Sequence, residues 1–207
     1  MIFRDMKALF NFLLISTSFI GFTMRLNCTD YKRIYNQRLE QFTRIEQSGK
    51  LWMNLKIYPR AVKVAELALQ GELSDAWALQ KMKGNELYFS LELQCPETGM
   101  TEFLNLDSDQ TTFSERVEYY HFQFLSDIKV ELDNKPISLA QFEFERLFNI
   151  SPKGKFFGVI PIKNNSKKLR ITIADKLYDH DTNLFEFDLS SIKKLPKLKK
   201  IKNPGKK

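Results

Sequence analysis

One segment near the C-terminus, DKLYDHDTNLFEF, holds the densest group of polar side chains in the sequence. It contains Asp175, Asp179, His180, Asp181 and Glu186. Carboxylates and an imidazole can together bind calcium or a transition metal, or they can supply a general base and the group that orients it. One hypothesis is therefore a metal-dependent hydrolase that uses the loop Asp179, His180 and Asp181.

The same cluster also fits an ordinary polar loop. A calcium-binding EF-hand loop needs a Gly and a terminal Glu at fixed steps, and neither falls at the required position here. Asp and Asn are frequent in loops because their side chains form hydrogen bonds with nearby backbone. The other histidine, His121, lies in the aromatic-rich stretch RVEYYHFQF, where we expect a hydrogen-bonded residue of the core or of a sheet face. We favour the loop, and we expect neither a metal nor a cofactor.

Sequence motifs of common enzymes are missing. The chain has no Gly-rich phosphate loop, no G-x-S-x-G nucleophile elbow and no H-E-x-x-H metal motif. It has eight glycines in all, so we do not expect backbone cradles for nucleotides. Two cysteines and two histidines also argue against a structural zinc site. We therefore expect a protein that is not an enzyme.

The first part of the chain has the plan of a secretory signal. Arg4 and Lys7 precede an uncharged, mostly apolar run at residues 8–24. As a helix this run would be about 26 Å long, against about 30 Å for the hydrocarbon core of a bilayer. We expect residues 1–28 to be a signal peptide or membrane anchor of an exported protein. A buried helix of a cytosolic protein is the alternative, and basic residues after the run, such as Arg25, weigh against export.

Cys28 follows closely after the apolar run, behind the triplet Arg25, Leu26 and Asn27. Its position resembles that of the lipid-bearing cysteine in bacterial lipoprotein signals. The resemblance implies that Cys28 is a lipid attachment site and that the protein lies in the bacterial cell envelope. An uncleaved anchor is the second interpretation. A disulfide between Cys28 and Cys95 would require cleavage before residue 28 without acylation.

The net charge of +7 arises from the C-terminal tail. Residues 193–207 hold eight lysines and no acid, which leaves 24 basic and 25 acidic residues in 1–192. We expect a disordered, solvated tail, although such a run can also contact anionic lipid head groups or nucleic acid. Because the body is close to neutral, we do not expect a nucleic-acid-binding domain. The lysines that we expect at a membrane or anion surface are Lys197, Lys199, Lys200 and Lys202.

The elements that would position these residues change in type along the chain. Residues 29–48 carry apolar side chains at spacings of three and four, which predicts an amphipathic helix. A short extended run is expected at 51–58. Two further helices are expected in RAVKVAELALQ and SDAWALQKMK, separated by Gly71. We assign residues 29–84 to a helical segment.

From Leu87 onward the sequence has the pattern of β-strands, because apolar residues recur at every second position. Such alternation is typical of antiparallel sheets with one apolar and one wet face. The strands that it predicts are 87–94, 101–106, 116–125, 128–132, 141–148, 155–162, 168–174 and 184–189.

The predicted fold class is α+β and mainly β, an antiparallel β-sandwich, Ig-like or Greek-key, preceded by a short helical N-terminal segment. The sandwich domain is expected to cover residues 85–192 and the disordered tail residues 193–207. These patterns favour a membrane-tethered, lipoprotein-like module that binds a protein or glycan partner without catalysis. The alternatives are the metal-dependent hydrolase and an intracellular adaptor with a nucleic-acid-binding lysine tail.

Overall fold

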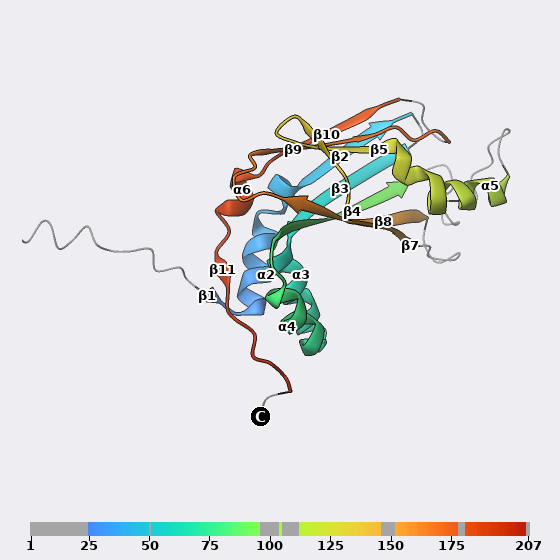
Figure 1. The fold of residues 1–207 in the computed structure, drawn as a ribbon. Helices are drawn as coiled ribbons and strands as arrows, with labels where there is room; N and C mark the ends of the chain where they lie inside the picture. The colour runs from blue at the N-terminus through green and yellow to red at the C-terminus, as the bar shows by residue number, and fades with distance from the viewer. Residues whose placement is uncertain are drawn as a thin grey trace, which may run out of the picture.

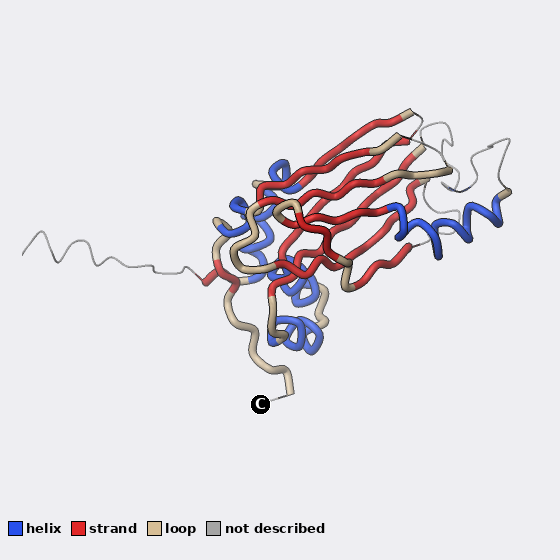
Figure 2. The backbone as a smooth tube through the Cα atoms, turned by 45° about the horizontal axis from the view of Figure 1, so that its top comes forward, coloured by secondary structure: helices blue, strands red, loops and turns tan. Residues whose placement is uncertain are grey.

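A computed structural model of the chain describes residues 25–49, 51–95, 104, 112–145, 152–177 and 181–205. They form a mixed α/β fold with two antiparallel sheets and one short pair of parallel strands. The helices gather at the two ends of the sheets (Figures 1 and 2). At one end lie α2 (Cys28–Gln37), α3 (Arg60–Leu69) and α4 (Leu73–Lys81), and at the other end lies α5 (Phe113–Glu118).

The larger sheet has five antiparallel strands in the order β2-β3-β4-β8-β7. Successive side chains of a strand point to opposite faces. On β3, Leu51, Met53 and Leu55 are therefore all fully buried, whereas the residues between them are exposed or half-buried. The strands are β2 (Thr43–Ser48), β3 (Leu51–Pro59), β4 (Asn85–Gln94), β7 (Gln141–Glu145) and β8 (Lys153–Ile162).

The smaller sheet has four antiparallel strands in the order β10-β9-β5-β6. Asp133 and Asn134 form the β5–β6 turn with φ of 51° and 64°, the left-handed conformation that two-residue hairpin turns require. The Asp133 carboxylate accepts hydrogen bonds of 2.9 Å from the backbone N–H groups of Lys168 and Lys167, which lower its pKa. The strands are β5 (Ile128–Leu132), β6 (Lys135–Ile137), β9 (Lys168–Ile173) and β10 (Asn183–Asp188).

Both sheets contribute their inward side chains to one hydrophobic core. At its centre, Phe89 of β4 lies opposite Gly158 of β8, and its ring occupies the space that a Cβ atom at residue 158 would need. The glycine therefore permits close packing of an aromatic ring on the neighbouring strand. The expected antiparallel sheets with one apolar face are confirmed, and neither sheet closes on itself.

The prediction of a helical segment at residues 29–84 is wrong for its middle part. Helix α2 ends at Gln37, and a 3-10 turn, η1 (Leu39–Phe42), leads into β2 and β3 at residues 43–59. Because β3 pairs with β4, the larger sheet extends across the boundary that we expected at residue 85. The physical reason is the alternation of buried side chains along β3, which places its apolar residues on one face of a sheet. The extended run expected at 51–58 and the two helices after it are confirmed.

The prediction of a strand at residues 116–125 is also wrong. This part is helical and consists of α5, the π-helical turn η4 (Tyr119–Gln123) and the 3-10 turn η5 (Phe124–Asp127). A capping box starts it: the Thr112 hydroxyl accepts from the Glu115 N–H at 3.3 Å, and the Glu115 carboxylate accepts from the Thr112 N–H at 2.6 Å. These two hydrogen bonds satisfy backbone N–H groups that have no partner at the start of a helix. A strand does not need such a cap.

Most of the remaining strand predictions agree with the structure where it describes them. The predicted strand at 141–148 is confirmed as far as residue 145. The one at 101–106 lies outside the described residues except for Leu104, which is in a 3-10 turn and not in a strand. Within the described ranges, no helix is long and apolar enough to cross a membrane. The strands confirmed to within two residues are those predicted at 87–94, 128–132, 155–162, 168–174 and 184–189.

Candidate functional site

The acidic cluster of the metal hypothesis does not form one site among the described residues. Asp179 and His180 lie outside them, and Asp181 is exposed. Asp175 is fully buried and accepts hydrogen bonds from the Tyr120 hydroxyl at 2.6 Å and from a backbone N–H at 2.9 Å, so it is part of the internal packing. In the described part of the chain, no three His, Cys, Asp or Glu side chains are grouped so that they could hold a metal ion.

Glu186, the last member of the predicted cluster, belongs to a surface network of the smaller sheet. Its carboxylate lies 2.7 Å from the Lys168 Nζ atom and 2.6 Å from the Arg170 Nε atom. These two hydrogen bonds lower the pKa of Glu186 because they favour its charged form. The cluster is thus divided between the interior, where Asp175 lies, and the outer face of β10.

Cys28 is the first residue of α2 and packs, half-buried, against the hydrophobic core. Burial raises the pKa of its thiol above the ordinary value. The preceding residue, Asn27, caps the helix, because its side chain accepts a hydrogen bond of 2.8 Å from the Asp30 N–H. The only other cysteine, Cys95, is buried, and no disulfide joins the two.

The lysine-rich tail is ordered where the structure describes it, which corrects the prediction of disorder for residues 193–205. A short helix, α6 (Ser190–Lys193), precedes a two-residue strand, β11 (Lys197–Leu198). This strand pairs in parallel with β1 (Arg25–Leu26), and the Lys199 N–H donates to the Leu26 carbonyl at 2.6 Å. We call this β1–β11 pair the clasp, because it joins the two ends of the described chain (Figure 1).

Helix α4 holds the tail beyond the clasp. The Gln80 side chain donates to the Lys199 carbonyl at 3.2 Å and accepts from the Ile201 N–H at 2.7 Å. On the other side of the clasp, the Arg38 guanidinium donates to the Lys194 carbonyl at 3.4 Å. The tail as far as residue 205 therefore follows one path over the helical end of the protein.

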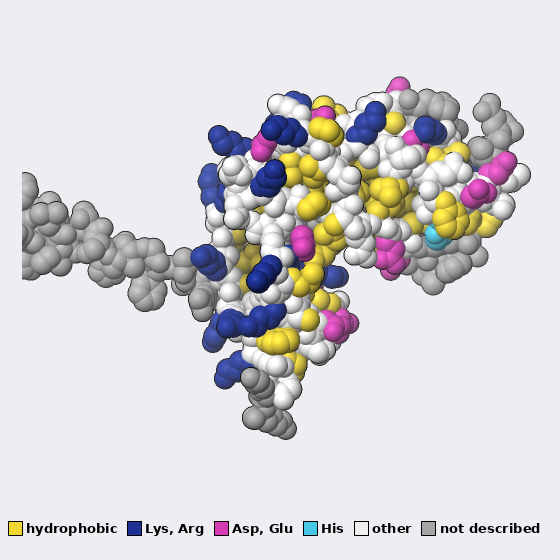
Figure 3. Space-filling model, viewed as in Figure 1, with side chains coloured by type: hydrophobic (Ala, Val, Ile, Leu, Met, Phe, Trp, Pro, Cys, Tyr) yellow, Lys and Arg dark blue, Asp and Glu magenta, His cyan; other side chains and the backbone are white. Residues whose placement is uncertain are grey.

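The four lysines that we expected at a membrane or anion surface are all exposed. We call them the basic face, and they are Lys197, Lys199, Lys200 and Lys202. Lys197 pairs with Arg25, the first described residue after the apolar run 8–24, and the Lys199 N–H donates to the Leu26 carbonyl. Figure 3 shows lysine and arginine side chains gathered at this end of the molecule. The structure thus brings together the cysteine and the lysines that sequence reasoning placed at opposite ends of the chain.

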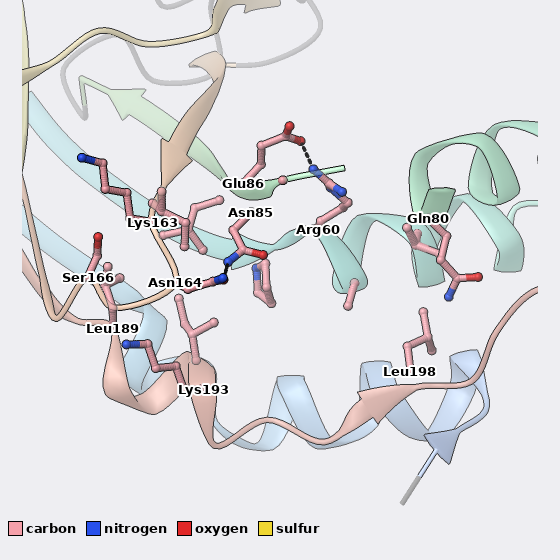
Figure 4. A pocket seen from close by; sticks show the side chains of 17 residues that line it. Arg60, Gln80, Asn85, Glu86, Lys163, Asn164, Ser166, Leu189, Lys193 and Leu198 are labelled. Carbon is pink, nitrogen blue, oxygen red and sulfur yellow. Dashed lines mark hydrogen bonds and ion pairs between the residues drawn. The ribbon is translucent and has the colours of Figure 1, made fainter. Parts of the chain in front are cut away.

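A pocket that sequence reasoning missed lies next to the clasp. It has a volume of about 380 Å³ and is enclosed by the start of α3, the start of β4, the end of β8 and the C-terminal segment 189–198 (Figure 4). Its lining residues are far apart in the sequence and form no motif. Only the fold, therefore, identifies this pocket.

The polar lining of the pocket divides into groups that have partners and a pair of exposed lysines. The Arg60 guanidinium lies 2.9 Å from the Glu86 carboxylate and donates to the Met82 carbonyl at 2.6 Å. The Asn85 side-chain amide donates to the Asn164 side-chain oxygen. Lys163 and Lys193 are exposed, and in Figure 4 their side chains lie apart from each other and point away from the other lining residues.

The comparisons with known proteins identify no relative: no protein-family model matches the chain, and no curated protein or solved structure matches it either. The functional argument therefore depends on the geometry of this chain. Two features of it are adjacent, the basic face and the pocket. Both use the C-terminal segment, because Leu198 of β11 lines the pocket and its two neighbours, Lys197 and Lys199, belong to the basic face.

Proposed function

We propose that the protein is a membrane-tethered, exported binding module that does not act as an enzyme. Its N-terminal apolar run holds it at a membrane, and its basic face lies against anionic lipid head groups. The two antiparallel sheets with their shared core would form a β-sandwich that carries the binding surface for a protein or glycan partner. The single observation that supports the proposal is the clasp, which pairs Lys197 of the basic face with Arg25, the residue that follows the apolar run in the sequence.

Electrostatics supports this arrangement. A lysine close to an anionic membrane surface contributes about 1 kcal/mol to binding, so the four lysines of the basic face could contribute about 4 kcal/mol. A disordered tail would lose conformational entropy when it binds, whereas this tail is already held by backbone hydrogen bonds to Leu26 and by the Gln80 side chain. The apolar run and the basic face would then act as two membrane signals on one side of the protein.

Of the two forms of tether, we favour the anchor that remains attached. Cleavage before Cys28 would remove Arg25 and Leu26, which form β1 and hold β11 in place. It would also remove Asn27, and the loss of an N-cap costs a helix about 1 kcal/mol. If the N-terminal segment is retained, the clasp and the Asn27 cap remain. Acylation of Cys28 requires cleavage before this residue, and both would then be lost.

Membrane fractionation of the full-length protein tests the tether. We expect the full chain to stay in the membrane fraction after washes at high salt and at alkaline pH. A variant without residues 1–24 keeps every described contact, and we expect salt to release it because only the basic face would hold it. Full-length protein in the soluble fraction would contradict the proposal. Digestion of intact cells by an external protease tests export, and a protected folded part would refute it.

The Cys28→Ser variant and mass spectrometry of the N-terminus distinguish the two forms of tether. Serine is close in size to cysteine and keeps the helix start, but it cannot carry the thioether-linked lipid. We expect this variant to stay in the membrane fraction and the wild-type protein to retain Met1. If the variant becomes soluble and the wild-type protein begins with an acylated Cys28, the lipid is the anchor and the retained segment is wrong.

A further inference from the structure

The larger sheet carries a groove of about 410 Å³. Strands β3, β4, β8 and β7 line it, and α3 contributes Lys63. Tyr88 of β4 lies opposite Val159 of β8, and Val159 lies opposite Gln141 of β7, so these three side chains form one row across the sheet. Ligand sites typically have volumes of about 300–1,000 Å³, so this groove has the size of a site for a small ligand.

The middle of the groove is apolar. Strand β8 lies between β4 and β7, and it contributes the half-buried side chains of Phe157 and Val159. The rings of Tyr58 and Tyr88 also line the groove, and they stack with their centroids 5.8 Å apart. A ligand that fills the groove therefore gains most if its middle part is apolar.

One side of the groove carries a negative charge. Strand β7 is at the edge of the sheet, and it contributes Glu143 and Glu145, which are both exposed. Glu145 lies opposite Lys155 of β8, so a positive charge faces it across the strands. Glu143 instead lies opposite Phe157 and forms no ion pair with another described residue. Its carboxylate is therefore available to a cationic group of a ligand.

The other side of the groove carries a positive charge. Lys63 belongs to α3, which follows β3 directly and contacts β3 and β4. The acid one helical turn further on, Glu66, is paired with Lys32 at 3.7 Å. Lys63 forms no ion pair within the described ranges, so it is available to an anionic group. The groove thus offers opposite charges on its two sides, with an apolar floor between them.

We infer that the groove binds a short apolar peptide with both ends free. The ammonium group of the peptide lies at Glu143, its apolar side chains lie against Phe157 and Val159, and its carboxylate lies at Lys63. The inference names a ligand for the binding surface of the proposed module and rests on that part of the proposal, but it does not depend on the tether.

The dimensions of the groove favour a peptide of about three residues. Two strands separate β3 from β7, so the backbones of β3 and β7 lie about 14 Å apart. The Lys63 and Glu143 side chains shorten this span, and an extended tripeptide is about 10 Å long. A single amino acid carries both charges on one Cα atom and would not reach both sides. A neutral oligosaccharide would leave both charges without an opposite partner.

A titration of the full-length protein in phosphatidylcholine nanodiscs tests the inference. The probe is trileucine, observed by saturation-transfer NMR, with empty nanodiscs as the blank. We expect N-acetyl-trileucine, which lacks the cation, and trileucine amide, which lacks the anion, each to bind about threefold more weakly than trileucine. Triglycine, which lacks the apolar side chains, should bind more than tenfold more weakly. If the protein proves not to need a membrane, the same titration is made without nanodiscs.

Two charge variants locate and orient the peptide in the groove. Glu143→Gln should bind trileucine about threefold more weakly and should no longer distinguish trileucine from its N-acetyl form. Lys63→Gln should show the same loss and should no longer distinguish trileucine from its amide. The control is Glu46→Gln, which removes an exposed carboxylate from β2, the opposite edge strand of the same sheet, and should leave all affinities unchanged. Circular dichroism checks that each variant is folded.

Three results would overturn the inference. The first is the absence of trileucine binding to the wild-type protein. The second is equal binding of trileucine and its two blocked forms, because the charges would then play no part. The third is wild-type affinity in both Glu143→Gln and Lys63→Gln, because the peptide would then lie elsewhere. Binding of maltotriose in place of trileucine would refute the peptide ligand and keep the binding module. Membrane fractionation decides the tether separately, so the two failures are distinguishable.

Discussion

Neutralisation of two lysines of the basic face should weaken the binding of the protein to anionic membranes. We consider Lys199→Gln together with Lys200→Gln, because both side chains are exposed and neither change alters the backbone. The Lys199 N–H would still donate to the Leu26 carbonyl, so the clasp should remain. The experiment therefore removes charge without releasing the tail.

The expected size of the effect follows from the charge that is removed. Each lysine near an anionic surface contributes about 1 kcal/mol, so the pair contributes about 2 kcal/mol, or about 30-fold in the partition coefficient. This effect should fade as salt rises, since the screening length falls from about 10 Å at 0.1 M to about 3 Å at 1 M. The value of about 2 kcal/mol applies to lysines that lie close to the membrane surface.

Vesicle flotation with the variant that lacks residues 1–24 measures the effect without the anchor. We expect binding to vesicles that contain phosphatidylglycerol, little binding to pure phosphatidylcholine vesicles, and about 30-fold weaker binding after the double substitution. Lys129→Gln with Lys135→Gln is the matched control, since it removes the same charge from two exposed positions on β5 and β6. The reasoning is refuted if both double variants bind anionic vesicles equally well, or if the lipid charge makes no difference.

Two further predictions concern the fold that carries these surfaces. Gly158→Ala should lower the free energy of unfolding by about 1–3 kcal/mol in a urea titration, because the new methyl group would overlap the Phe89 ring; an unchanged midpoint would contradict this packing. Hydrogen bonds from the Lys168 and Lys167 N–H groups lower the pKa of Asp133 in the folded protein. In the unfolded chain the pKa of an aspartate is about 3.9. The contribution of Asp133 to stability is therefore present above that pH and is lost as the pH falls through the lower pKa of the folded state. Asp133→Asn should therefore be less stable than the wild-type protein at pH 7, and the difference between their urea midpoints should shrink below about pH 4; a difference independent of pH would exclude the carboxylate as its cause.

Much of the sheet structure could be predicted from the sequence because burial on one face leaves a period of two. This signal is strong in β5 and in the second part of β10, residues 185–188, where apolar and charged residues alternate without interruption. It failed at Tyr119 and Tyr120, where aromatic residues occupy adjacent positions and indicate no period. The available signal was the capping box of Thr112 and Glu115, a pattern specific for the start of a helix.

The candidate site could be predicted only in parts. The sequence indicated an apolar run, Cys28 and a lysine tail, but nothing in it showed that the first and last strands would pair. A hint of order was present in the tail, where Leu195, Leu198 and Ile201 interrupt the lysines and are half-buried in the structure. The pocket left no local signal, because it depends on the three-dimensional arrangement of segments with no common motif.

The clasp also determines when the protein can become complete during its synthesis. β1 is made near the start of translation and β11 near its end, so almost the whole described chain must leave the ribosome before the two strands meet. A nascent chain therefore lacks the ordered patch of lysines. In the tether that we propose, premature termination would leave the apolar run 8–24 without these lysines, and such fragments would bind the membrane less firmly.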